Sequence, residues 1–227
     1  QGLLAADQAQ SYIPYDTMLE IHLLVALIHV IAGGFFVLSL ASECSAEALR
    51  EAARRDPLTG LLNRRAFETL LARLLGRNDV GLAVVDVDHF KSVNDRYGHA
   101  AGDLVLKSVS RVLLEVVGEH GHVARIGGEE FALVLVGVDA ARAAMLAEAA
   151  RRAVQGNVVD CSGTLIEVTV SIGVAHASHA GKTADAFLES ADRALYRAKG
   201  DGRNICAAGP EANWTSPVRP APARLAG

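Results

Sequence analysis

The chain has 227 residues, 51% of them hydrophobic, and a formal net charge of −4. This length is sufficient for one good-sized domain with additional segments, and without a basic excess nucleic acid is not an expected partner. The three cysteines (Cys44, Cys161 and Cys206) are odd in number and widely spaced, with no C-x-x-C pair that would suggest a metal site. The composition therefore favours a reducing compartment.

The N-terminal part contains one long apolar segment. The sequence begins with Gln1 and not with methionine, so residues 1–17 are treated as an N-terminal flank and the sequence can be part of a longer protein. Residues 18–41 are almost wholly apolar, and about 20 such residues can form a transmembrane helix. Acidic residues precede this segment and arginines follow it, which predicts an inner (cytoplasmic) membrane location with the C-terminal side in the cytoplasm. A buried helix of a soluble sensor domain is the alternative.

A change in composition follows the apolar segment. Residues 42–55 are polar and alanine-rich, with apolar residues at heptad-like spacing, and are expected to form a short helical stalk. Pro57 disfavours helix at the residue before it, so a second domain is expected over residues 56–206. Residues 207–227 contain four prolines and little core-forming content, which is typical of a disordered tail.

Hydrophobic periodicity predicts both helices and strands in the second domain. Helices are expected at residues 63–75, 103–117, 140–154 and 184–199, and strands at 81–85, 122–126, 131–136, 158–161 and 165–174. Residues 89–97 are expected to form a loop or short helix. Asp103, which follows a glycine-containing turn, taken alone indicates a helix N-cap.

Two groups of carboxylates follow apolar strands. Asp86 and Asp88 end a short apolar strand and can share a face because strand side chains alternate. A bound cation such as Mg²⁺ would offset the cost of burying two carboxylates, whereas two helix N-caps would need no cation. Glu129 and Glu130 follow a Gly-Gly pair in a predicted hairpin turn, where they are either solvated or hold a cation.

Two cations close the last predicted helix. Lys199 and Arg203 lie near a glycine-containing turn, from which both can reach a phosphate group. Cations at a helix C-terminus also interact favourably with the helix dipole, and this is the simpler interpretation of the pair.

Six sequence blocks, taken together and in order, resemble the diguanylate cyclase (GGDEF) family. They are Asp56-Pro57-Leu58-Thr59-Gly60, Asp86-Val87-Asp88-His89-Phe90-Lys91, Asn94-Asp95, Gly98-His99-x-x-Gly102-Asp103, Arg125-x-Gly127-Gly128-Glu129-Glu130-Phe131 and Ala198-Lys199-x-x-Gly202-Arg203-Asn204. The resemblance covers roughly residues 45–206, and six blocks in this order are far more specific than any one of them. The turn motif is the GGEEF variant, with Glu in its third position, which in the family is still an active form.

The resemblance implies a fold and a reaction. The implied fold is α+β, with a palm-like central antiparallel sheet flanked by helices, similar to nucleotidyl cyclases and polymerases. The implied reaction condenses two GTP into cyclic di-GMP and releases two pyrophosphates. Each GTP offers its 3′-hydroxyl to the α-phosphate of the other, so two domains must face each other in a homodimer, formed through this domain and the stalk.

The resemblance also implies the metal and catalytic residues. Asp86, the carbonyl of Val87 and Glu129 would hold Mg²⁺, or Mn²⁺ in its place, and these oxygen ligands suit hard cations. Glu129 would also help to deprotonate the 3′-hydroxyl, and Lys199 and Arg203 would act on the phosphates.

The remaining implied residues bind the substrate. Asn94 and Asp103 resemble the family's guanine-reading residues. The others are the phosphate cradle and the two turn glycines that leave room for the nucleotide, namely the backbone N–H groups of His89 and Phe90, the side chain of Lys91, and Gly127 with Gly128.

One departure from the family pattern concerns product inhibition. Many members carry an Arg-x-x-Asp pair that binds product, nine and six residues before the first turn glycine. Gly118 and Gly121 occupy these places here, so no inhibitory product site is expected. A non-catalytic GTP-binding regulatory module is the alternative to an active cyclase. The full set of metal, guanine and phosphate groups favours the enzyme.

Overall fold

A computed structural model describes residues 15–209 except positions 53, 75 and 179–182. The chain divides into two compact units, Gln1–Ala53 and Arg54–Gly227, each described here by itself. The proposed N-terminal flank up to residue 14 and the proposed tail from residue 210 onward lie outside the described residues.

The first unit is built on one helix, α1 (Tyr15–Ala52). Its segment Asp16–Leu40 spans 25 residues with a mean hydropathy of 2.5. At 1.5 Å per residue this segment is about 37 Å long, and the hydrocarbon core of a bilayer is about 30 Å thick. Large apolar side chains along it are exposed, such as Phe35 at 75%. By length and composition α1 can cross a membrane, although a signal sequence meets the same criterion.

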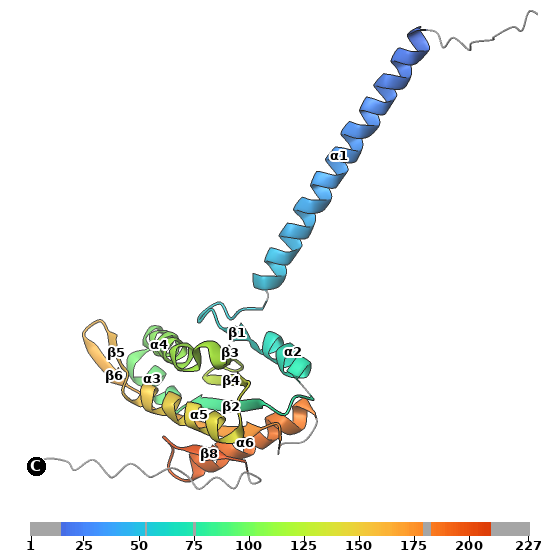
Figure 1. Cartoon of the computed structure of the whole chain (residues 1–227). Helices are drawn as coiled ribbons and strands as arrows, with labels where there is room; N and C mark the ends of the chain where they lie inside the picture. The colour runs from blue at the N-terminus through green and yellow to red at the C-terminus, as the bar shows by residue number, and fades with distance from the viewer. Residues whose placement is uncertain (1–14, 53, 75, 179–182, 210–227) are drawn as a thin grey trace, which may run out of the picture. The chain divides into compact units, whose positions relative to one another are not determined.

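The second unit contains a six-stranded sheet in the order β1-β3-β4-β2-β7-β8 (Figure 1). These strands are β1 (Leu62–Asn63), β3 (Gly121–Arg125), β4 (Glu130–Val136), β2 (Val80–Val87), β7 (Val170–His176) and β8 (Cys206–Ala208). The four central strands pair antiparallel, while the short edge strands β1 and β8 pair parallel with their neighbours. The predicted central antiparallel sheet is therefore confirmed. A separate hairpin consists of β5 (Val158–Cys161) and β6 (Thr164–Glu167).

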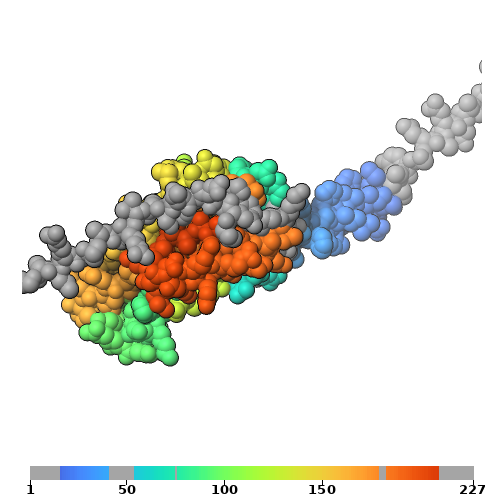
Figure 2. Space-filling model, turned by 90° about the horizontal axis from the view of Figure 1, so that it is seen from below, coloured from blue at the N-terminus to red at the C-terminus, as the bar shows by residue number. Residues whose placement is uncertain are grey.

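Helices cover both faces of the sheet. They are α2 (Arg64–Leu74), α3 (Phe90–Tyr97), α4 (His99–Val117), the short 3₁₀ helix η1 (Gly118–His120), α5 (Ala140–Gln155) and α6 (Ala184–Gly200). Buried side chains of α4 and α5 pack on one face, and those of α2 and α6 pack on the other. In Figure 2, α6 and β8 form an orange and red surface of the second unit. This arrangement confirms the predicted α+β fold.

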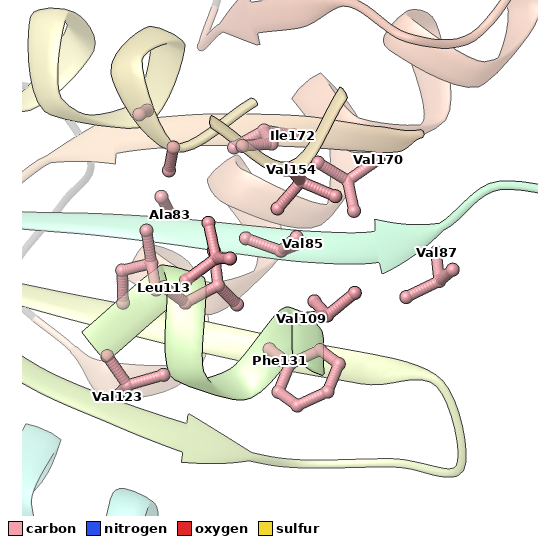
Figure 3. Close-up of a cluster of buried hydrophobic side chains, with 14 of the residues drawn as sticks. Ala83, Val85, Val87, Val109, Leu113, Val123, Phe131, Val154, Val170 and Ile172 are labelled. Carbon is pink, nitrogen blue, oxygen red and sulfur yellow. The ribbon is translucent and has the colours of Figure 1, made fainter. Parts of the chain in front are cut away.

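The central strand β2 contributes side chains to two hydrophobic cores, one on each face of the sheet. All eight of its residues are buried, which is why the sequence there is a continuous apolar run rather than an alternating one. Ala83, Val85 and Val87 belong to the core under α4 and α5, shown in Figure 3, and Leu82 and Val84 belong to the other core. Because β2 is held on both faces and by two neighbouring strands, the residues at its C-terminal end are rigidly placed.

The structure differs from the sequence prediction at three element boundaries. The helix α4 begins at His99 after Gly98, so Asp103 lies inside the helix and is not its N-cap, which corrects that reading. The strand predicted over residues 165–174 is two strands, β6 and β7, separated at Val168 and Thr169. Only β7 joins the main sheet, because β6 turns back onto β5. The last strand, β8, ends at Ala208, two residues beyond the predicted domain end at residue 206.

Candidate functional site

The C-terminal end of β2 lies beside the turn between β3 and β4. Asp86 pairs in register with Glu130 of β4 and with Ser171 of β7. The N–H of Val87 donates a hydrogen bond of 3.2 Å to the carbonyl of Glu129. Sheet pairing thus brings together the three residues that the sequence analysis assigned to a metal site, Asp86, Val87 and Glu129.

Lys199 joins these groups from the end of α6. Its Nζ lies 2.7 Å from Oδ2 of Asp86, whose side chain is only 9% exposed. Burial raises the pKa of Glu129 above its usual value and the nearby Asp86 carboxylate raises it further, while the Lys199 cation opposes the shift. The two carboxylates are thus close enough to repel each other, and a cation between them would relieve that repulsion.

The donor set fits a hard cation that completes its coordination with non-protein oxygens. Among the described residues, no group of three or more His, Cys, Asp or Glu side chains could hold a metal. Asp86 and Glu129 offer two carboxylates, and the Val87 carbonyl offers a third oxygen. Mg²⁺ commonly binds through one or two carboxylates plus substrate phosphates, and the chemistry of these residues matches that pattern.

The two acids of the turn lie in different environments. Glu130 begins β4, and its carboxylate lies over Gly127, where a Cβ atom would overlap Oε2 of Glu130. Gly128 has open space where its Cβ would be. The side chain of Glu129 interacts electrostatically with Asp86 and Lys199. The two carboxylates therefore have different neighbours, although the charge of Glu130 also raises the pKa of Glu129.

Arg125 forms a brace between Asp56 and the turn that joins β3 to β4. Its Nη2 donates to the carbonyl of Gly128 (2.7 Å), and its Nη1 donates to Oδ1 of Asp56 (3.1 Å). Burial alone would raise the pKa of Asp56, but hydrogen bonds from Thr59 and Arg125 hold it below its usual value. The sequence analysis missed this brace, although both residues lie in blocks that carry the family resemblance.

Asp88 has a different role from Asp86. Its Oδ1 accepts from the hydroxyl of Ser171 (2.7 Å), and its Oδ2 accepts from the hydroxyl of Thr169 (2.7 Å). Oδ2 also accepts from the backbone N–H of Asn204 (3.0 Å). These three donors engage a side chain that is 5% exposed. Asp88 therefore ties β2 to β7 and to the segment after α6.

The predicted guanine readers lie on the adjacent helices α3 and α4. Asn94 packs against Gly102, where a Cβ atom would overlap Oδ1 of Asn94, and Asp103 is the next residue and is exposed. The absence of a side chain at Gly102 therefore makes room for the Asn94 side chain against α4, the helix that carries Asp103. The guanine-reading role of the two residues stays a prediction.

The predicted phosphate-binding groups lie in two segments. His89 has a left-handed φ of 57° just before α3, Phe90 packs into the core, and Lys91 is exposed. The side chain of Phe90 is therefore occupied by packing, and only the backbone N–H of this residue is suited to binding a phosphate group. Arg203, after α6, is exposed and has a left-handed φ of 61°.

Gly118 and Gly121 stand in place of the inhibitory Arg-x-x-Asp pair, and the local backbone geometry favours glycine at both positions. Gly118 has a φ of 48°, which disfavours other residues. A Cβ atom at Gly121 would overlap the backbone carbonyl oxygen of Val134 on the neighbouring strand. An aspartate at this position would require the sheet to shift.

Comparisons with known proteins agree with this architecture. Residues 53–205 match the family described as "Diguanylate cyclase, GGDEF domain". The chain is 44% identical over 164 residues to diguanylate cyclase DgcM of Escherichia coli K12, covering 70% of this chain and 39% of DgcM. It is 39% identical over 163 residues to diguanylate cyclase DgcP of Pseudomonas aeruginosa, covering 70% of this chain and 24% of DgcP. The chain thus spans less than half of the length of these relatives.

Solved structures of GGDEF and GGEEF domains are also similar to this chain. The coiled coil and GGDEF domain of DgcB from Caulobacter crescentus, in complex with c-di-GMP, superposes with a TM-score of 0.72 at 33% identity, covering 81% of this chain and all of that one. The active GGEEF domain of a diguanylate cyclase from Vibrio cholerae superposes with a TM-score of 0.60 at 30% identity, covering 67% of this chain and 99% of that one. On sequence, sheet order and site geometry together, the chain belongs to the GGDEF family of diguanylate cyclase domains.

Proposed function

We propose that the chain is a diguanylate cyclase that condenses two GTP into cyclic di-GMP and two pyrophosphates. The observation that carries the proposal is the convergence of Asp86, Val87 and Glu129 at one end of the sheet with Lys199 beside them. This is a carboxylate, a carbonyl, a second carboxylate and a cation, which is the chemistry that phosphoryl transfer requires. Family membership and the curated diguanylate cyclases among the relatives support the same reaction.

Each residue has a defined role in this proposal. Asn94 and Asp103 accept hydrogen bonds from the guanine N–H groups, while Lys91, Lys199, Arg203 and the backbone N–H groups of His89 and Phe90 hold the triphosphate. Gly128 leaves room for the nucleotide against the hairpin, whereas the space over Gly127, expected to serve the same purpose, is taken by the carboxylate of Glu130. Asp86, the Val87 carbonyl and Glu129 would hold Mg²⁺ or Mn²⁺, which would neutralise charge on the phosphates when bound.

The chemical step joins the two nucleotides. The 3′-hydroxyl oxygen of each GTP forms a bond to the α-phosphorus of the other, and the bond from that phosphorus to the β-phosphate bridging oxygen breaks. Pyrophosphate leaves with the electron pair of that bond, and Glu129 accepts the hydroxyl proton. One domain holds one GTP, so the active form is a homodimer.

We also propose that the N-terminal helix anchors this enzyme in a membrane. In the proposal residues 18–41 span the inner membrane, residues 42–55 form the stalk, and the catalytic domain lies in the cytoplasm, where GTP is available. The length and hydropathy of Asp16–Leu40 support this arrangement. Nucleic acid is not a partner in this proposal.

A matched pair of substitutions in the turn tests the catalytic assignment. Glu129→Gln in the full chain, purified in detergent, should bind GTP and lower cyclic di-GMP formation by at least about 100-fold. Glu130→Gln should lower the activity less than Glu129→Gln does, because Asp86 and Lys199 act on Glu129, whereas the Glu130 carboxylate lies over Gly127. Retained activity in Glu129→Gln would remove Glu129 from the mechanism. Binding of GTP without turnover in the unsubstituted chain would favour a regulatory module.

A further inference from the structure

Arg151 on α5 is the only lysine or arginine with a buried side chain among the described residues, at 4% exposed. Its guanidinium forms a two-bond fork with Glu148, with Nε–Oε2 at 2.8 Å and Nη2–Oε1 at 2.9 Å. Its Nη1 donates to Oε1 of Gln155 (2.9 Å) and to Oδ1 of Asn204 (2.5 Å). Glu148 supplies the opposite charge, and the bond to Asn204 adds a link from α5 to the segment after α6.

Asn204 is held from a second direction by Asp88. The backbone N–H of Asn204 donates to Oδ2 of Asp88, a side chain that the hydroxyls of Thr169 and Ser171 also hold in place. A continuous hydrogen-bonded network therefore runs from the end of β2, through Asn204, to Arg151 on α5. Asp88 lies two residues from Asp86, so the network ends beside the candidate metal site.

The segment clamped by this network includes Arg203. Arg203 and Asn204 have left-handed φ values of 61° and 49°, an uncommon conformation for two successive residues other than glycine. The N–H of Arg203 donates to the carbonyl of Ala198 (3.1 Å), which closes the turn after α6. Conformations of this kind persist where surrounding contacts hold them, and here the contacts from Arg151 and Asp88 do so on both sides of Asn204.

We propose that Arg151 is a positioning residue for triphosphate binding: through Asn204, it fixes the direction in which Arg203 leaves the backbone. The inference rests on the proposed function, in which Arg203 binds the substrate phosphates. The hydrogen bonds of Arg151 go to Glu148, Gln155 and Asn204, so it acts through other residues and is not catalytic. Removing the residues that orient metal ligands typically costs about 10–100-fold in metal affinity or activity, and we expect an effect at the lower end of that range here.

The most direct test removes the link without burying an unpaired charge. Asn204→Gly still permits the left-handed backbone and leaves Arg151 paired with Glu148 and Gln155. In the full chain with Mg²⁺, calorimetry should show a Kd about tenfold higher for a GTP analogue with a methylene group between its α- and β-phosphates. Unchanged affinity in Asn204→Gly would overturn the proposal.

A double-mutant cycle separates positioning from a general loss of structure. In an Arg203→Ala background, Asn204→Gly should weaken binding by less than about twofold further, because the group that it positions is gone. Arg151→Met should likewise lose its effect on the Kd in the Asn204→Gly background. Independent, multiplying losses in the Asn204→Gly and Arg203→Ala cycle would contradict the inference, even if Arg151→Met does not fold.

The neighbouring residue provides a matched control. Arg152 also pairs with Glu148 (2.6 Å) but is exposed, and Arg152→Met should bind the analogue within about twofold of the unsubstituted chain. The analogue cannot release pyrophosphate, so binding is measured independently of turnover. Analogue binding without turnover of GTP would contradict the proposed activity alone. Failure of the unsubstituted chain to bind the analogue would overturn both proposals.

Discussion

Nζ of Lys199 lies 2.7 Å from Oδ2 of Asp86, so a cation from the protein already pairs with the carboxylate that the proposed function assigns to a metal ion. Lys199 and a divalent cation would therefore share Asp86. The same lysine also lowers the pKa of Glu129, against the effects of burial and of Asp86. Lys199 thus limits the negative charge of the site when no nucleotide is bound.

Removing Lys199 should change metal binding and substrate binding in opposite directions. Without nucleotide, Lys199→Met should bind Mn²⁺ about two- to fivefold more tightly, because the partly exposed ion pair no longer competes. Its KM for GTP should rise, because a phosphate-binding cation is lost. Electron paramagnetic resonance of free Mn²⁺ measures the first effect, and Lys107→Met, on the exposed side of α4, is the control. Weaker Mn²⁺ binding in Lys199→Met would contradict this account.

The brace between Asp56 and Arg125 should contribute measurably to the stability of the second unit. Asp56→Asn should lower its free energy of unfolding by about 1–3 kcal/mol, because the largely buried Arg125 loses a charged partner. Circular dichroism during heating would show a lower Tm. Arg64→Met, which breaks the exposed pair with Glu68, should cost at most about 0.5 kcal/mol. Equal effects of the two substitutions would argue against the brace.

The pH dependence of this effect follows from the pKa of Asp56. That pKa is lowered from its usual 3.8 in the folded protein, so the stabilisation is fully present above the unfolded value and is lost as pH falls through the folded value. The difference in Tm between the unsubstituted chain and Asp56→Asn should therefore stay constant from about pH 8 to pH 5. A difference that shrinks across this range would show that another group is responsible.

Substitution of Gly128 tests whether this turn residue serves nucleotide binding or folding. Gly128→Ala should leave the Tm unchanged, because a Cβ atom there meets open space, but should raise the KM for GTP if the nucleotide lies against the turn. Gly156→Ala, at the end of α5, is a control in which the new Cβ makes only ordinary contacts. Unchanged kinetics in Gly128→Ala would place the nucleotide elsewhere.

Product inhibition through the Arg-x-x-Asp position should be absent. Micromolar cyclic di-GMP should leave the initial rate of the full chain unchanged, since Gly118 and Gly121 provide neither a guanidinium nor a carboxylate. The double substitution Gly118→Arg with Gly121→Asp should lower the Tm rather than create inhibition, because a side chain at 121 overlaps the carbonyl of Val134. A rate halved by micromolar product in the unsubstituted chain would contradict this prediction.

The sequence was most informative where local patterns determine the geometry. A continuous apolar run predicted the buried strand β2 and placed Asp86 at its end, and the Gly-Gly pair predicted the hairpin turn beside it. Apolar alternation alone could not assign roles to two similar residues in one motif, and the choice of Asp86 over Asp88 as a metal ligand came from the family resemblance. Asp86 and Asp88 look alike in sequence, and only the register of β7 shows that Thr169 and Ser171 engage Asp88.

Long-range contacts were the least predictable. Arg151 has the sequence context of an ordinary arginine in an alanine-rich helix, and its partner Asn204 is 53 residues away. The break between β6 and β7 was missed because apolar alternation continues through Val168 and no turn residue marks it. The start of α4 was missed because Gly98, rather than Asp103, precedes its first turn.

The central claim is that this chain joins two GTP molecules, and the stoichiometry of its products tests that claim most directly. The full chain in detergent is incubated with GTP and Mg²⁺ at protein concentrations that allow dimers, and chromatography quantifies cyclic di-GMP while a coupled assay quantifies pyrophosphate. The account predicts two pyrophosphates for each cyclic di-GMP, with both products nearly abolished in Glu129→Gln. GTP that binds but yields no cyclic di-GMP, or pyrophosphate released without it, would contradict the account.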